Sequence, residues 1–140
     1  MHQQNLQSLY DYLREAAVEA LTGSLSFAPF GAAIRQSGEK THLAADLLPQ
    51  TSVPEDHIAG IIAALRQEDQ SVGLIAAGLV FDTQLQSEAG PVAALGFHIE
   101  VSNGDALQIF QAYQRPDGVA VVLSAPELQP VYPEIFAAPA

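Results

Sequence analysis

The sequence predicts an α+β fold, a two-layer sandwich in which two helices pack on one mainly antiparallel sheet of about five to six strands. Three observations predict it. Two segments carry apolar residues at helical spacing. Short apolar runs between and after them are separated by turn dipeptides such as Ser37-Gly38 and Asn103-Gly104. The resulting order of helix, two strands, helix and four strands is typical of an α+β domain.

The first half of the chain predicts one helix and one hairpin. Gly23 indicates the end of the first helix, whose apolar positions recur every three or four residues. A strand follows from Phe27 to Gln36, and Pro29 indicates that regular pairing begins just after it. Ser37-Gly38 then predicts a tight turn into a second strand, Lys40 to Asp46.

The second helix and the strand after it have clear signals. Ser52 and Glu55 have the spacing of a capping box, and Pro54 is tolerated in a first helical turn. The predicted core face of this helix consists of Ile58, Ile61, Ile62 and Leu65. The segment Val72 to Asp82 is apolar at odd and even positions alike, which predicts a central strand covered on both faces.

A hairpin centred on Asn103-Gly104 is the strongest local signal in the chain. Residues 83–90 are expected to form a polar connection, and a strand is expected from Pro91 to Ser102. Because Asn-Gly suits a two-residue type I′ loop, Ser102 is predicted to pair with Asp105. Counting outward from that pair fixes the register of the whole hairpin.

The predicted register gathers polar and apolar residues on one sheet face that a single helical layer would leave uncovered. The candidate interface or ligand face consists of His98, Glu100, Leu107, Ile109 and Tyr113. Three explanations stay open: cover by the C-terminal tail, association with a second copy or a partner, or a groove for a ligand.

The end of the chain predicts a last strand and an extended tail. Residues 115–118 (Arg-Pro-Asp-Gly) predict a turn into a strand over residues 119–124. We therefore divide the chain into one α+β domain, residues 1–124, and a tail, residues 125–140, which contains four prolines and should be extended. Its apolar residues Tyr132, Ile135 and Phe136 predict docking on the body or on a partner.

Composition excludes several classes of function. The 140 residues include 5 Lys+Arg and 16 Asp+Glu, a net charge of -11, which disfavours nucleic acid and anionic membrane surfaces as partners and favours a basic one. The absence of cysteine excludes disulfides and thiolate metal sites. The first residues lack the basic and apolar regions of a secretory signal, so we expect a cytoplasmic protein.

No pattern in the chain identifies a catalytic, cofactor or metal site. His98 and Glu100 lie two apart on a strand and so share a side, but two ligands do not make a metal site. Neither a G-x-S-x-G elbow nor a glycine-rich phosphate loop occurs. We therefore expect no catalytic residues, no cofactor and no metal.

Several structural motifs resemble a family of small uncharacterised bacterial proteins. They are Phe27-Ala28-Pro29-Phe30-Gly31-Ala32, the turn at Ser37-Gly38, the helix after Val53-Pro54, the strand ending in Phe81-Asp82 and the final Ile135-Phe136. The resemblance covers most of the chain and implies a similar hairpin, helix and antiparallel strands, with no activity attached. In element order the chain is also similar to roadblock and profilin-like modules, which are dimerising regulators.

These observations favour a non-catalytic protein-interaction or regulatory module that forms a homodimer. The alternative is an immunity protein that neutralises a basic toxin domain. A small-ligand-binding protein or enzyme that uses His98, Glu100 and Tyr113 is the third hypothesis.

Overall fold

The computed structural model describes residues 2–22, 27, 29–43, 54–102, 104–114 and 121–136. The helices are α1 (His2–Thr22) and α2 (Pro54–Val72), and the strands are β1 (Phe30–Arg35), β2 (Lys40–Leu43), β3 (Leu74–Ser87), β4 (Gly90–Val101), β5 (Ala106–Gln114), β6 (Val122–Leu123) and β7 (Glu127–Pro130). The predicted end of the first helix at Gly23, the cap at Ser52, the end of the second strand at Asp46 and the turn at residues 115–118 lie outside the described residues.

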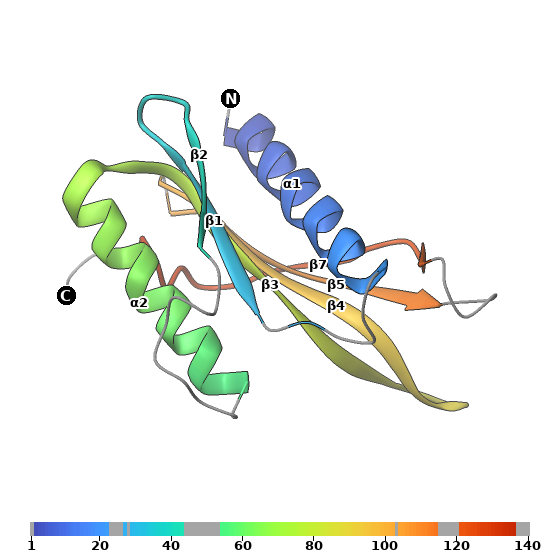
Figure 1. Ribbon diagram of the computed structural model, residues 1–140. Coiled ribbons are helices and arrows are strands. Elements are labelled where there is room, and N and C mark those ends of the chain that lie inside the picture. The colour runs from blue at the N-terminus through green and yellow to red at the C-terminus, as the bar shows by residue number, and fades with distance from the viewer. Residues whose placement is uncertain are drawn as a thin grey trace.

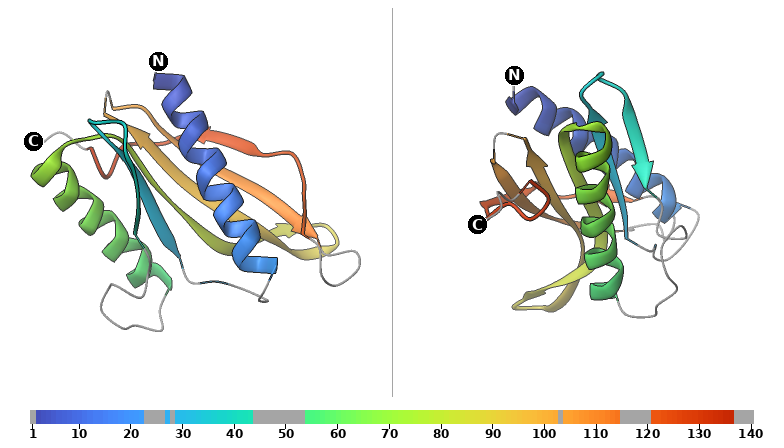
Figure 2. Two further views of the ribbon diagram at one scale, coloured as in Figure 1. Left: turned by 45° about the horizontal axis from the view of Figure 1, so that its top comes forward. Right: turned by 90° about the vertical axis from the view of Figure 1, so that its left-hand side faces the viewer.

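The described strands form one antiparallel sheet with the order β2-β1-β3-β4-β5-β6, and β7 also pairs with β5. The α+β class, the two helices and the antiparallel sheet are therefore confirmed. The layering differs from the expected two-layer sandwich, because α1 and α2 lie on opposite faces of the sheet (Figures 1 and 2). The sheet is the middle one of three layers.

Strand β3 shows why the sheet is covered on both sides. Ala76 and Val80 pack in the cluster under α1, while Ala77 and Leu79 pack in the cluster under α2. All four side chains are fully buried. The prediction of a strand apolar at odd and even positions is thus confirmed, and its two faces are covered by two different helices.

Each helix buries one apolar stripe. On α1, Leu9, Leu13, Ala17 and Leu21 recur at every fourth position and are fully buried. On α2, Ile61 and Leu65 are likewise four positions apart and buried. Gly31 of β1 permits the close approach of α2, because a Cβ built there would lie 2.7 Å from Ile61 Cγ2.

The hairpin of β3 and β4 is longer than predicted. Residues 83–87 continue β3 rather than forming a polar connection, and the ladder runs without a shift from Ala76↔Val101 to Ser87↔Gly90. Ser87 pairs with Gly90 across the turn, and Gly90 has a φ of +112°, a conformation that glycine adopts at little cost. Thr83, Gln84 and Gln86 are polar because this end of the hairpin projects beyond both helices (Figure 1).

Candidate functional site

The register of β4 and β5 decides which of the predicted site residues lie together. Val101 N–H donates to Asp105 O at 2.9 Å, and Gly104 N–H donates to Val101 O at 3.0 Å. The paired residues are accordingly Glu100↔Ala106 and Phe97↔Ile109. The expected pairing of Ser102 with Asp105 is wrong by one residue, because a positive φ of 100° at Gly104 fits a longer loop with a glycine bulge.

This shift separates the candidate face into two sets. A one-residue change of register turns every side chain of one strand to the other face of the sheet. His98 and Glu100 lie on the face of α2, whereas Leu107, Ile109 and Tyr113 lie on the face of α1. The single mixed surface predicted from the sequence does not form.

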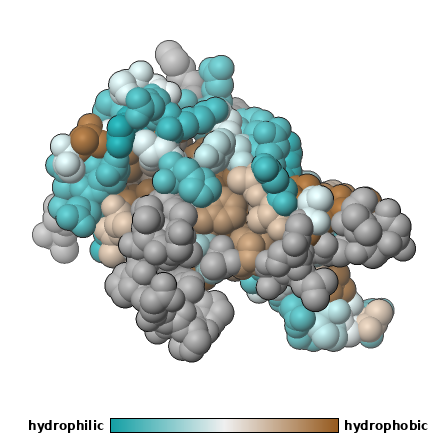
Figure 3. Space-filling view, viewed as in Figure 1, coloured by the Kyte–Doolittle hydropathy of each residue, from teal (hydrophilic) through white to brown (hydrophobic). Residues whose placement is uncertain are grey.

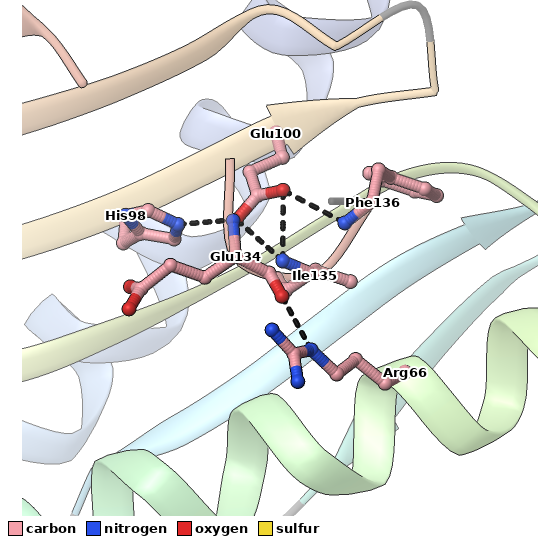
Figure 4. Close-up of polar contacts among 6 residues, drawn as sticks. All are labelled: Arg66, His98, Glu100, Glu134, Ile135 and Phe136. Carbon is pink, nitrogen blue, oxygen red and sulfur yellow. Dashed lines mark hydrogen bonds and ion pairs between the residues drawn. The ribbon is translucent and has the colours of Figure 1, made fainter. Parts of the chain in front are cut away.

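Glu100 is the most enclosed polar side chain on the α2 face (Figure 4). It has no solvent exposure, and His98 Nε2 lies 2.5 Å from its Oε2. Three backbone N–H groups of the C-terminal segment also donate to its carboxylate: Glu134 at 2.7 Å, Ile135 at 2.8 and 2.9 Å, and Phe136 at 3.0 Å. Successive N–H groups that converge in this way form an anion-binding nest.

Packing holds this segment, residues 134–136, against the sheet. Ile135 is 4% exposed and belongs to the apolar cluster of Ile61 and Leu79. Arg66 of α2 donates a hydrogen bond to the carbonyl of Glu134. Of the tail residues expected to dock, Ile135 and Phe136 pack on this cluster, whereas Tyr132 is 92% exposed.

Electrostatics favour the ionised form of Glu100. Burial by itself raises the pKa of the carboxyl, but the hydrogen bonds from His98 and from the three amides outweigh it and hold the pKa below its ordinary value. Both carboxylate oxygens already accept hydrogen bonds. Glu100, paired with His98, therefore holds the C-terminal segment on the sheet.

The α1 face contains a groove instead. Its volume is about 410 Å³, and it lies between α1, the strands β4 and β5, and the segment that includes β7. Its lining residues are Leu6, Gln7, Tyr10, Arg14, Ile99, Leu107, Ile109, Gln111, Pro126 and Leu128. The structure thus places two of the predicted site residues, Leu107 and Ile109, in this groove.

A buried polar pair lies in the groove. Tyr10 OH donates to Gln111 Oε1 at 2.5 Å, and Gln111 Nε2 donates to Ser124 O at 2.7 Å. Arg14 lies over the ring of Tyr10, with its guanidinium carbon 5.1 Å from the ring centroid. Tyr10, Arg14 and Gln111 were not predicted as site residues. The correct register of β5 would have placed Gln111 on the α1 face.

Tyr113 contributes to the core rather than to the groove. It is 6% exposed, and its hydroxyl donates to Asp82 Oδ1 at 2.9 Å. It lies on the same face as Ile109, where it joins the C-terminal end of β5 to the middle of β3.

No family model, curated protein or solved structure matches the chain. Two of the motifs that carry the resemblance make structural contacts: Phe30 stacks on His42 with ring centroids 5.1 Å apart, and the backbone N–H groups of Ile135 and Phe136 donate to Glu100.

The described part of the chain contains neither a metal-binding cluster nor a membrane-spanning helix. No group of three or more His, Cys, Asp and Glu residues there is arranged to hold a metal ion. Neither described helix is long and apolar enough to cross a membrane.

Proposed function

We propose that the protein is a non-catalytic interaction module that self-associates through its C-terminal edge. The observation that carries this proposal is the exposure of three large apolar side chains along that edge: Val122 at 54%, Leu128 at 59% and Tyr132 at 92%. We call these three residues the edge surface. Among the described residues, only Val72 is a further large hydrophobic residue of this kind, at 48% exposure.

The position of the edge surface suits a contact between proteins. The strands β6 and β7 lie at the outer side of β5, and all four residues of β7 are exposed. By contrast, hydrophilic side chains predominate around the β1–β2 turn and the C-terminal part of α2, which are visible in Figure 3. Exposed apolar side chains that gather on one edge are typical of an association site.

Association through this edge should use side chains rather than a continued sheet. Val131 N–H donates inward to Ala106 O, so the nitrogen of Pro130, one residue earlier, points away from β5. Proline has no N–H, and its place on the outer side of an edge strand is a common defence against strand addition. The contact surface would consist of Leu128, Tyr132 and Val122 meeting the same residues of a second copy.

Salt separates this proposal from the immunity-protein alternative. Two copies that each carry a net charge of -11 repel each other, so added salt should screen the repulsion and strengthen a homodimer. A complex with a basic toxin domain should respond in the opposite direction, because salt screens an attraction.

Sedimentation-velocity measurements over a dilution series test the proposal. The wild type should form a dimer, and the double variant Leu128→Gln/Tyr132→Ser should weaken it about ten-fold or more, since uncharged substitutions remove apolar contact without adding repulsion. Val72→Gln is the matched control and should leave the dimer unchanged. A wild type that stays monomeric at all concentrations, or equal weakening by both variants, would contradict the proposal.

A further inference from the structure

We infer that the groove between α1 and β5 is a binding site for an amphipathic carboxylate with an aliphatic chain. This inference goes beyond self-association and does not depend on it, although Leu128 belongs both to the edge surface and to the wall of the groove. The groove volume of about 410 Å³ is within the range of about 300–1,000 Å³ typical of small-molecule sites.

The groove has an apolar part and a polar end. Leu6, Leu107 and Ile99 line one part of it, and Ile109 and Leu128 continue the apolar wall. Register places Ile99 opposite Leu107, four residues along β5 from Gln111. Since α1 and β5 run in the same general direction (Figure 2, left), Leu6 lies toward this apolar part, and Arg14 lies toward the end marked by Tyr10 and Gln111.

Arg14 supplies the charge that selects an anion. Its guanidinium is held over the Tyr10 ring, which orients it at the polar end of the groove. Its ion pair with Asp11 has a separation of 3.3 Å, and the two side chains are 33% and 42% exposed. An exposed pair of this kind contributes little free energy, so a ligand carboxylate can replace or share it.

The other described arginines are engaged elsewhere. Arg35 pairs with Glu39 and Glu68, and Arg66 donates to the carbonyl of Glu134. The chain has a net charge of -11 and only five basic residues. It is therefore unusual that one of them, Arg14, lines a largely apolar groove. Charge complementarity therefore favours an anionic head group at Arg14.

The floor of the groove explains why the remainder of the ligand should be apolar. Tyr10 OH is already a donor to Gln111, and the amide nitrogen of Gln111 already donates to Ser124 O. A polar ligand body would have to compete with these buried hydrogen bonds. An aliphatic chain needs none of them and can lie along Leu107, Ile109 and Leu128. From Leu6 to Arg14 the helix advances about 12 Å, which suits a medium-length chain.

The test compares two ligands that share one chain, octanoate and 1-octanol, by isothermal titration calorimetry. Octanoate should bind one site per chain, about ten-fold or more tightly than the alcohol, because a charge-assisted hydrogen bond contributes at least this factor. Arg14→Gln should weaken octanoate about ten-fold and leave the alcohol unchanged. Lys40→Gln removes a charge from β2 and is the matched control, for which no change is expected.

Backbone amide shifts on addition of octanoate provide a second measurement. They should concentrate on α1 residues near Leu6 and Arg14 and on Leu107 to Gln111. The inference is overturned by an absence of binding at millimolar octanoate, by equal affinities for acid and alcohol, by equal effects of Arg14→Gln and Lys40→Gln, or by shifts outside the groove.

Discussion

Two buried polar pairs lie on opposite faces of the sheet, His98 and Glu100 on β4 and Tyr10 of α1 with Gln111 of β5, and they differ in what surrounds them. His98 and Glu100 are enclosed by residues 134–136, whose three amides complete the hydrogen bonding of the carboxylate. Tyr10 and Gln111 are equally hidden, at 8% and 5% exposure, but they line an open groove. The enclosed pair serves the fold, while the other pair lies in the wall of a groove that is open to a ligand. The sheet thus holds the C-terminal segment on one face and borders a groove on the other.

The largest effect should follow from breaking the enclosed pair. In Glu100→Gln, an amide NH₂ group faces donors that the carboxylate now satisfies, and each buried donor left without a partner costs about 1–3 kcal/mol. We expect the free energy of unfolding to fall by about 3 kcal/mol, measured by urea denaturation. Glu15→Gln on the exposed side of α1 is the control and should change stability by less than about 0.5 kcal/mol.

A small effect of Glu100→Gln would contradict this comparison. It would mean that water replaces the C-terminal segment at the carboxylate without cost. Amide exchange at Ile135 gives an independent check, because its protection should be lost in the variant and retained in Glu15→Gln.

The second effect is a dependence of stability on pH. The pKa of Glu100 is lowered in the folded state, so its contribution is fully present above the unfolded value of about 4.3 and is lost as pH falls through the lower folded value. The wild type should therefore lose this part of its stability as the pH falls below about 4.3. The difference between wild type and Glu100→Gln, measured by urea denaturation at each pH, should shrink over that range.

A difference that stays constant with pH would mean that Glu100 does not titrate with an altered pKa. A difference in the free energy of unfolding that grows toward acid pH would mean that folding raises the pKa of Glu100 instead of lowering it. Either result would mean that the attachment of residues 134–136 to the sheet does not depend on the charge of the Glu100 carboxylate.

Much of this architecture could be predicted from local patterns. Helical spacing predicted α1 and α2, and the run of apolar residues in Val72 to Asp82 predicted a strand covered on both faces. That same run should have placed the helices on opposite faces, because each face of a buried strand needs its own cover. The expectation of one helical layer overlooked this consequence.

The candidate site was less predictable for two physical reasons. Asn-Gly suits a two-residue loop, but its glycine also suits a longer loop with a bulge, and the choice between them turns every residue of β5 to the other face. The carboxylate of Glu100 accepts hydrogen bonds from the backbone amides of residues 134–136, which are 34 to 36 positions away in the sequence. Backbone amides have no side-chain signal in a sequence. Tyr10 and Gln111 are 101 residues apart, and only the three-dimensional fold brings them together.

The smallest effect should come from the pair beside the groove. Tyr10→Phe removes the hydroxyl that donates to Gln111 Oε1 and leaves the ring on Phe97 and beneath Arg14. Because the groove opens to solvent, water can reach the freed oxygen, so the free energy of unfolding should fall by only about 1 kcal/mol. Tyr132→Phe, at a 92% exposed side chain, should have no effect on stability. A loss of about 3 kcal/mol in Tyr10→Phe, equal to that of Glu100→Gln, would show that water does not reach Gln111 Oε1. The two pairs would then not differ in their access to solvent, contrary to the comparison above.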